Sequence, residues 1–344
     1  MDVADSLEPA TNFPRDASDK RYTASLALIR SSGGEVIQME RSMFATPAHR
    51  RPRLNVLSVL AGVFIYAMLL SSALADPVSF RMSPRGHILV PVSVDGGAPR
   101  TFVLDTGAGS STVTPDLARE LGLEAIPGES ARALGKHGST ENPIVRVKSL
   151  SLGDSKAVDR RLVVLGLDHI TLGEWQADGI LGMDFLRAFD LRIDFASRSI
   201  DLFPGASSVE RCRACPAGVE GTAFETVRPA FVILPITVDG HPVRAVLDTG
   251  SGHSGLNGKA VASLGVTLPP LPQGSPQGHG FGLETGPVRL GDQLLTERAT
   301  LRVMDHPVMS ALGLSDGPSM LIGTDQFSGR TLTICYQLET VFLQ

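Results

Sequence analysis

The feature that most constrains this chain is an internal repeat whose two copies carry the same order of segments. Residues 88–109 read ILVPVSVDGGAPRTFVLDTGAG, and residues 232–252 read VILPITVDGHPVRAVLDTGSG. Each copy has an apolar strand, a turn around Asp-Gly and a second apolar strand that ends at Asp-Thr-Gly. Two such copies indicate a duplication that kept one carboxylate in each half. Two carboxylates related in this way, Asp105 and Asp248, can face each other across a two-fold axis.

The repeat continues beyond these first strands. After each Asp-Thr-Gly, the segments TPDLARELG and NGKAVASLG follow at the same spacing and predict a short helix. Gly-rich stretches that contain a histidine come next, at 133–140 and 274–282, and are predicted to be hairpins. Leu-Gly-Asp then recurs at 152–154 and 290–292, as a turn between two short strands.

A second motif, two apolar residues followed by glycine, closes each copy. It reads ILGMDFL at 180–186 and LIGTDQF at 321–327, and alternating strands that begin DLRIDF and TLTICY follow it. The copies therefore lie near 86–205 and 228–344, and the small and polar residues of 206–224 are predicted to link them. With 36 Gly, 23 Pro and 5% aromatic residues, the composition favours a turn-rich β protein. The predicted fold class is all-β, with two tandem lobes.

In these motifs the chain resembles bacterial retropepsin-like aspartic proteases, with two subunit-sized lobes fused in one chain. The resemblance covers nearly all of residues 86–344 and implies two acid-protease β-barrel lobes with a cleft between them. It also implies that the apolar-apolar-Gly strand lies beside the catalytic loop and holds it in place. Each lobe is much shorter than a pepsin lobe, and neither predicted flap contains tyrosine. Pepsin is therefore a poor guide to how substrate enters.

The repeat and the resemblance assign the catalytic role to Asp105 and Asp248. Peptide hydrolysis requires a nucleophile, a proton acceptor and a proton donor, and two adjacent carboxyl groups that share one proton can supply all three with a bound water. The residues expected to support the two catalytic loops are Thr106, Gly107, Thr249, Gly250, Ser251, Gly182 and Gly323. Among them, the resemblance implies that the two threonine hydroxyls lock one loop to the other.

The residue after each Asp-Thr-Gly differs between the copies, Ala108 in the first and Ser251 in the second. A hydroxyl at this position can donate to its aspartate and favour the ionised form, whereas alanine cannot. This difference predicts that Asp248 is more readily ionised than Asp105.

Two further pairs of aspartates are related by the repeat. Asp95 and Asp239 precede glycine in Val-Asp-Gly, which is typical of hairpin turns. Asp184 and Asp325 begin a short helical segment after glycine, so the main prediction for them is helix capping. Contact with the catalytic loop is the less favoured alternative.

The predicted substrate is an extended polypeptide bound as a strand between the lobes. The hairpins at 133–140 and 274–282 would cover it, and their glycines allow movement. The residues assigned to these flaps are Gly135, His137, Gly138, His279 and Gly280. No third ligand accompanies the two histidines, so no metal is predicted, and the chemistry of a carboxyl pair requires no cofactor. Trp175 is predicted to pack within its lobe or to line a pocket.

Residues 54–75 form a membrane-targeting segment. They contain no charged residue and follow Arg50, Arg51 and Arg53, so the N-terminal side of the segment is expected in the cytoplasm. The length of the segment fits a single transmembrane anchor. Its Ala-Leu-Ala end at 73–75 is typical of a signal peptide before cleavage. Both alternatives remain open.

The true start of the chain is either Met1 or Met43. Residues 1–53 are predicted to be a disordered or cytoplasmic extension, since they show no apolar periodicity. A start at Met43 would instead leave an ordinary signal peptide with a basic beginning. Either start exports residues 76–344, to the periplasm or to the outer side of a membrane anchor.

The three cysteines allow two states. Cys212 and Cys215 form a C-x-x-C motif in the predicted linker, and Cys335 lies far downstream. The motif lacks nearby metal ligands and the βαβ unit of a redox site. A local disulfide or free thiols are therefore predicted, and an oxidising compartment favours the disulfide.

The sequence also argues against several functions. A net charge of −5 without a basic stripe does not favour nucleic acid as a partner, and the G-x-S-x-G, H-E-x-x-H and P-loop motifs are absent. Two lobes in one chain make a monomer sufficient for activity, with membrane association only if residues 54–75 are retained. The main prediction is an active aspartic endopeptidase. The alternatives are an inactive protease-like protein that binds peptides and a membrane-tethered interaction protein whose lobes serve as a scaffold.

Overall fold

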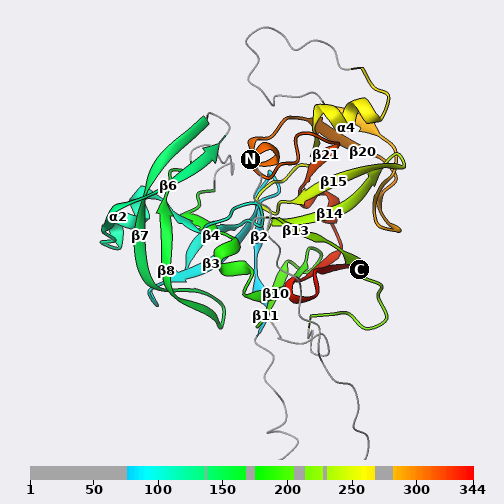
Figure 1. The fold of residues 1–344 in the computed structure, drawn as a ribbon. Helices are drawn as coiled ribbons and strands as arrows, with labels where there is room; N and C mark the ends of the chain where they lie inside the picture. The colour runs from blue at the N-terminus through cyan, green and yellow to red at the C-terminus, as the bar shows by residue number, and fades with distance from the viewer. Residues whose placement is uncertain (1–75, 136–137, 168–174, 205–213, 228–230, 268–281) are drawn as a thin grey trace, which may run out of the picture. The chain divides into compact units, whose positions relative to one another are not determined.

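The computed structural model describes residues 76–135, 138–167, 175–204, 214–227, 231–267 and 282–344, which form strands and a few short helices (Figure 1). The predicted N-terminal extension and the signal or anchor segment, residues 1–53 and 54–75, lie outside these residues. In the part of the chain that is described, no helix is both long enough and apolar enough to cross a bilayer. The predicted all-β class is confirmed for both lobes.

The first lobe is built on an eight-stranded sheet with the strand order β2-β3-β4-β9-β5-β8-β7-β6. Its strands are β2 (Arg81–Met82), β3 (Ile88–Val94), β4 (Arg100–Leu104), β5 (Thr112–Val113), β6 (Ala125–Gly135), β7 (Gly138–Leu152), β8 (Ser155–Val164) and β9 (Gly179–Leu181). β9 runs parallel to β4, with Leu181 opposite Leu104, and antiparallel to β5. The apolar-apolar-Gly strand thus lies beside the strand that ends at Asp105.

The second lobe repeats this arrangement in a nine-stranded sheet. The strand order is β17-β20-β16-β21-β15-β14-β18-β19, and β13 also pairs with β14. The strands are β13 (Glu225–Val227), β14 (Phe231–Val238), β15 (His241–Leu247), β16 (Gly255–Leu256), β17 (Gly282–Thr285), β18 (Val288–Leu290), β19 (Gln293–Thr296), β20 (Ala299–Val303) and β21 (Ser319–Ile322). β21 takes the place of β9, parallel to β15 and antiparallel to β16, with Ile322 opposite Leu247.

Short helices occupy matching positions in the two lobes. The helical segments are α2 (Pro115–Glu120), α3 (Met183–Leu186), α4 (Gly258–Ser263), α5 (Pro307–Ala311), η2 (Thr324–Phe327) and η3 (Tyr336–Leu338). α2 and α4 confirm the two predicted helices, and the side chains of Thr114 and Asn257 cap their first turns. α3 and η2 directly follow the two apolar-apolar-Gly strands.

A third sheet joins the lobes, because it contains the final strands of both. Its order is β1-β11-β10-β22-β23-β12. These strands are β1 (Val78–Ser79), β10 (Phe189–Asp194), β11 (Ser199–Pro204), β12 (Thr222–Ala223), β22 (Thr331–Cys335) and β23 (Thr340–Leu343). At its centre β10 and β22 run antiparallel, with Arg192 opposite Thr333. These two residues hold the same position in the two copies, so a local two-fold axis passes between them.

The Asp-Gly turns predicted from sequence are present in both lobes. Asp95 and Asp239 adopt φ angles of 53° and 51°, and the glycines that follow them also have positive φ. Aspartate tolerates this left-handed region and glycine favours it, so Val-Asp-Gly specifies the turn locally. The turns place β3 against β4 and β14 against β15, which are the strand pairs that end at Asp-Thr-Gly.

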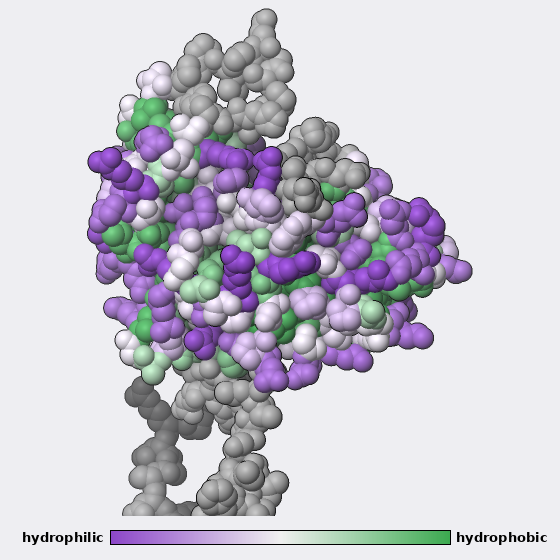
Figure 2. Space-filling view, turned by 180° about the vertical axis from the view of Figure 1, so that it is seen from behind, coloured by the Kyte–Doolittle hydropathy of each residue, from purple (hydrophilic) through white to green (hydrophobic). Residues whose placement is uncertain are grey.

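One apolar core runs through strands of both lobes and of the shared sheet. Its members come from alternate positions of the strands, as in β3, whose pattern of burial alternates along Val90–Val94. On the face shown in Figure 2, hydrophilic residues are mixed with scattered hydrophobic ones. Hydrophobic burial is therefore the main source of cohesion between the strands.

Two segments differ from the predicted boundaries. Thr222 and Ala223, predicted to belong to the linker, form β12 and pair with β23. Residues 78–82, which precede the predicted start of the first lobe, form β1 and β2 and pair with β11 and β3. Strands of two residues are too short to show an alternating pattern, so sequence periodicity does not reveal them. Residues 205–213 of the linker region lie outside the described residues.

Candidate active site

The two candidate catalytic aspartates occupy equivalent positions at the ends of β4 and β15. Asp105 donates its backbone N–H to Leu181 O at 3.0 Å, and Asp248 donates to Ile322 O at 3.0 Å. Each aspartate is therefore held by the apolar-apolar-Gly strand of its own lobe. The repeated sequence thus produces the same backbone hydrogen bond in both lobes.

Thr106 and Thr249 link the two loops through four buried hydrogen bonds. The N–H of Thr106 donates to Oγ1 of Thr249 at 3.0 Å, and the N–H of Thr249 donates to Oγ1 of Thr106 at 3.0 Å. The hydroxyls in turn donate across the lobes, from Thr106 to Leu247 O at 2.8 Å and from Thr249 to Leu104 O at 2.9 Å. These contacts join the lobes directly beneath the aspartates and satisfy every polar group involved.

Gly107 and Gly250 bring each loop against the carboxyl group of the other lobe. A Cβ atom at Gly107 would lie 2.6 Å from Cγ of Asp248, and a Cβ atom at Gly250 would lie 2.2 Å from Cγ of Asp105. Any side chain at these positions would collide with a carboxyl group. The two aspartates, far apart in sequence, therefore meet at this interface, and glycine is required here for close approach.

Gly182 and Gly323 perform a similar packing role within each lobe. A Cβ atom at Gly182 would lie 2.7 Å from the carbonyl carbon of Ser110, and one at Gly323 would lie 2.7 Å from Ser251 O. The residues after these glycines donate their N–H groups to the catalytic loops, Met183 to Ala108 O at 2.8 Å and Thr324 to Ser251 O at 2.9 Å. Each glycine thus lets its strand end lie directly against the loop that carries the aspartate.

Asp184 and Asp325 contact the catalytic loops and do not cap helices, so the main prediction for them is wrong. Oδ1 of Asp184 accepts the N–H and the hydroxyl of Ser111 at 2.7 and 2.6 Å. Asp325 accepts the N–H of Ser254 at 3.0 Å and its hydroxyl at 2.6 Å. Neither helical segment has a side-chain cap. A folded loop offers a backbone N–H and a hydroxyl together, and this pair outcompetes the weaker capping contact.

Ser111 and Ser254 complete this contact and were missed by the sequence reasoning. Their hydroxyls accept the N–H of Gly182 at 3.0 Å and of Gly323 at 2.9 Å. Both serines are fully buried. The signal that could have found them is the repeat itself, because each serine follows its Asp-Thr-Gly at the same spacing. We call each Ser–Asp pair with its glycine N–H a loop clamp.

The electrostatics of the two aspartates are unequal. Burial raises the pKa of both carboxyl groups, and the adjacent Asp105 carboxylate raises the pKa of Asp248 further, to well above its usual range. For Asp105, the N–H of Gly107, 2.7 Å from Oδ1, opposes the effect of burial. Oδ1 of Asp248 is buried and has no hydrogen-bond partner among the described residues. The pair therefore favours holding one shared proton, and the N–H of Gly107 favours the charge on Asp105.

The predicted order of ionisation loses its basis in the folded loop. It assumed that the Ser251 hydroxyl donates to Asp248, but this hydroxyl donates to His253 O at 2.9 Å. The loop turns back on itself after Ser251, so a backbone carbonyl becomes the nearer acceptor. The missing hydroxyl at Ala108 does not decide the matter, because backbone N–H groups stabilise the charge on Asp105.

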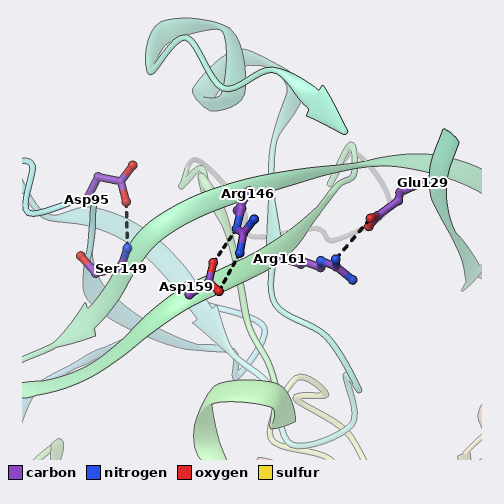
Figure 3. A network of polar contacts seen from close by, with 6 residues as sticks. All are labelled: Asp95, Glu129, Arg146, Ser149, Asp159 and Arg161. Atoms are coloured by element: carbon purple, nitrogen blue, oxygen red, sulfur yellow. Dashed lines mark hydrogen bonds and ion pairs between the residues drawn. The ribbon is translucent and has the colours of Figure 1, made fainter. Parts of the chain in front are cut away.

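The two strands of the predicted first flap, β6 and β7, are present, and ion pairs join each of them to β8 (Figure 3). Nη2 of Arg146 in β7 lies 2.7 Å from Oδ2 of Asp159 in β8, and Arg161 in β8 lies 3.2 Å from Glu129 in β6. Asp95 accepts a backbone N–H from β7. These pairs are exposed, so each adds little to stability.

The tips of the predicted flaps are only partly described. Gly135 and Gly138 lie opposite each other at the ends of β6 and β7, which confirms a hairpin at 133–140. β6 also contacts α5 of the second lobe. His137, His279 and Gly280 lie outside the described residues. Among the residues that are described, no group of three His, Cys, Asp or Glu side chains is placed to hold a metal ion.

Two other sequence predictions concern Trp175 and the cysteines. Trp175 packs beside buried residues of the first lobe, and the guanidinium of Arg81 lies 4.6 Å from the centre of its ring. Cys215 is disulfide-bonded, and its Sγ lies 3.4 Å from that of Cys335, a buried residue of β22. Cys212 lies outside the described residues. The proximity of Cys335 to the C-x-x-C motif is a tertiary contact that spacing in the sequence does not reveal.

The comparison with protein families agrees with this geometry. The model of the aspartyl protease family matches residues 90–185 and 234–326, once in each lobe and over more than half of the chain. The chain therefore belongs to the aspartyl protease family, in its retropepsin-like form with two tandem lobes. A search of curated proteins found no match.

Proposed function

We propose that this protein is an aspartic endopeptidase in which Asp105 and Asp248 together activate a water molecule. The observation that carries the proposal is the meeting of two buried carboxyl groups from duplicated loops, each packed against the glycine of the opposite loop. Two like charges in such a place cannot both ionise, so the pair holds one proton between them. An acid and a base at neighbouring positions are what hydrolysis of an amide requires.

The unequal electrostatics assign a role to each carboxyl group. Asp105, the ionised member, accepts a proton from water as the water oxygen attacks the scissile carbonyl carbon. Asp248, the protonated member, donates a hydrogen bond and then its proton to the carbonyl oxygen. The resulting tetrahedral intermediate collapses when Asp105 passes its proton to the amine nitrogen, the C–N bond breaks, and Asp248 takes back the proton of the hydroxyl that becomes the carbonyl oxygen of the new acid. At the end, one proton again lies on the pair, so the cycle is closed.

The proposed substrate is an extended polypeptide. Two β lobes that meet at the aspartates can pair with the backbone of an extended chain, and the β6–β7 hairpin supports this because it contacts the second lobe as well. The uncharged segment at 54–75, preceded by arginines, supports action outside the cytoplasm. Retention or cleavage of that segment would decide between a membrane-anchored and a periplasmic enzyme, and N-terminal sequencing of the exported protein distinguishes them.

The test is proteolysis by the full chain on a library of proteome-derived peptides. We expect Asp105→Asn and Asp248→Asn each to lower kcat/KM by at least about 100-fold, because each removes the acid or the base. Asp292→Asn, an exposed turn aspartate of the second lobe, is the matched control and should cleave like wild type. A wild-type protein that cuts no peptide while remaining folded would instead support an inactive peptide-binding protein.

The pH dependence of kcat/KM provides an independent test. Activity requires one proton on the pair, so the rate should fall as rising pH removes the proton from Asp248 and also as falling pH adds a second proton to Asp105. Because burial raises both pKa values, both limbs should lie above those of an exposed carboxyl pair. The raised pKa values also make the free energy of unfolding depend on pH. The contribution from the pair is present at low pH and is lost as pH rises through the raised folded pKa values.

A further inference from the structure

The second catalytic loop carries a basic side chain that the first loop lacks. His253 follows the Asp-Thr-Gly-Ser-Gly of the second copy, and Ser110 holds the same position in the first. The His253 side chain is exposed, although both neighbours, Gly252 and Ser254, are buried. The imidazole therefore projects from a fixed point on the loop that holds Asp248.

Arg302 lies beside this loop and also has no counterpart in the first lobe. Its N–H donates to Ser254 O at 3.0 Å, and β20 places it opposite Gly255 in a parallel pair. The equivalent position opposite Thr112 in the first lobe is Val163, a buried apolar residue. At this position, a guanidinium is therefore present in the second lobe and not in the first.

Arg85 approaches the same loop from the segment before β3. A Cβ atom at Gly252 would lie 1.5 Å from Arg85 O, so the two backbones are in direct contact. The next residue, Gly86, accepts the Thr324 hydroxyl at 2.7 Å, which fixes the segment on the second lobe. On the loop of the first lobe, the corresponding neighbour of Gly109 is the ring of Phe231, an apolar group.

The positive charges of the two arginines are not neutralised by any carboxylate in the part of the chain that the structure describes. Among the described residues, neither Arg85 nor Arg302 forms an ion pair or a side-chain hydrogen bond. The carboxylate of Asp325, which acts on His253, is engaged by both donors of Ser254. Burial lowers the pKa of His253, and the charges of Arg302 and Arg85 lower it further while Asp325 opposes them. Both arginines are therefore close enough to act on the imidazole, and they favour its neutral form.

We infer that Arg85, His253 and Arg302, named here the lobe-2 basic group, select an acidic side chain of the substrate on one side of the scissile bond. This inference rests on the proposed function, which sets where an extended chain passes the aspartates. An extended substrate presents alternate side chains to each lobe, so a charge in one lobe contacts only alternate residues of the substrate. The first lobe offers Ser110 and Val163 at the same places, which predicts a one-sided preference.

The experiment uses one cleaved parent peptide and a set in which Glu or Gln replaces each of the four residues on either side of the cut. For the wild-type full chain, we expect Glu to be favoured over Gln by about 5-fold in kcat/KM at one or two positions on a single side, the value of a partly exposed ion pair. This Glu-to-Gln ratio should fall towards one as salt is raised.

Variants of the lobe-2 basic group test whether its residues produce the Glu-to-Gln ratio. Arg302→Gln and Arg85→Gln should each lower the Glu-to-Gln ratio, His253→Ser should lower it by copying the first loop, and Arg302→Lys should restore most of it. Arg298→Gln removes an exposed arginine from the end of the neighbouring turn and should leave the ratio unchanged. Equal cleavage of Glu and Gln peptides by wild type at every position would overturn the inference, as would a preference that survives Arg302→Gln together with His253→Ser.

Failure of the proposed function is recognised separately. If wild type cuts no peptide, the same peptides can be titrated onto the Asp248→Asn full chain by fluorescence anisotropy. Tighter binding of Glu peptides, lost in Arg302→Gln, would support the inference in a binding protein without catalysis. Equal binding of Glu and Gln peptides would overturn it.

Discussion

At the scale of single residues, the two aspartates differ because of the groups that their oxygens meet. Asp105 receives the N–H of Gly107 at 2.7 Å, whereas Oδ1 of Asp248 is buried without a partner among the described residues. A buried carboxyl oxygen that lacks a donor favours the protonated form of its group. The sequence pointed to Ser251 as the source of asymmetry, but its hydroxyl turns away to His253 O.

Ser251→Ala should therefore leave both limbs of the pH–rate profile in place. The variant loses one hydrogen bond inside the loop, so its stability should fall by about 1 kcal/mol, measured by chemical denaturation. Ala108→Ser is the companion variant, since it adds a hydroxyl beside the ionised aspartate. A shift of the alkaline limb in Ser251→Ala would show that the hydroxyl acts on Asp248 after all.

Asp190 is a residue outside the active site whose ionisation is also opposed by burial. It lies in β10 of the shared sheet, is 3% exposed and accepts the N–H of Tyr336 at 2.9 Å. Burial raises the pKa of its carboxyl group above the usual value, against the effect of the N–H donors from Tyr336 and Gln337. Within the shared sheet, the carboxyl group of Asp190 therefore favours its protonated form.

Asp190→Asn keeps the acceptor oxygen and removes the titration. The raised folded pKa means that wild type loses stability relative to this variant as pH rises through that pKa. The difference in Tm, variant minus wild type, should be more positive at pH 7 than at pH 4 in thermal unfolding. A difference that is the same at both pH values would contradict the assignment.

At the scale of elements, the end of each apolar-apolar-Gly strand supports the loop that carries the aspartate. The two loop clamps fasten that loop through Ser111 with Asp184 and through Ser254 with Asp325. Sequence alone predicted that the strand and the loop are neighbours, since both motifs recur in the same order. It did not predict the clamps, because a Ser and an Asp that are some 70 residues apart meet only in the folded chain.

Ser111→Ala and Ser254→Ala should each reduce kcat more than they raise KM. The loss of the hydroxyl leaves a carboxylate with one donor fewer, and stability should fall by about 1–3 kcal/mol. Steady-state kinetics below the unfolding range measures the first effect and denaturation the second. Ser111→Thr retains the hydroxyl and should recover kcat, whereas the exposed neighbour in Ser110→Ala is the control. Equal kcat in Ser111→Ala and wild type would show that the clamp is only structural.

At the scale of the whole molecule, two of the contacts between the lobes follow a two-fold relation. The first is the pairing of β10 with β22, and the second is the four-bond contact of Thr106 with Thr249. Both places use matching residues from the two copies. A duplicated chain can build such contacts from one ancestral surface, because a two-fold interface requires only that the surface complement itself.

Thr106→Val and Thr249→Val should each destabilise the protein by about 1–3 kcal/mol, since buried carbonyl and N–H groups lose their partners. The two effects should not add in a double-mutant cycle, because the threonines bond to each other. Thr333→Val is a matched control. Thr333 is also buried, but its hydroxyl has no partner among the described residues, so its replacement should be neutral or stabilising. Additive losses in the cycle would show that the two threonines act independently.

What the sequence by itself determined was the class of fold, the two lobes and the pairing of Asp105 with Asp248. These follow from local signals, namely alternating strands, Asp-Gly turns and a repeat of motifs in order, and such signals need no knowledge of distant neighbours. Only the tertiary structure decided which groups surround each aspartate, why Gly107 and Gly250 must be glycine, and how Arg85 and Arg302 come to flank His253. Hydrogen bonds and burial set these properties, and the atoms involved become neighbours only when the chain has folded.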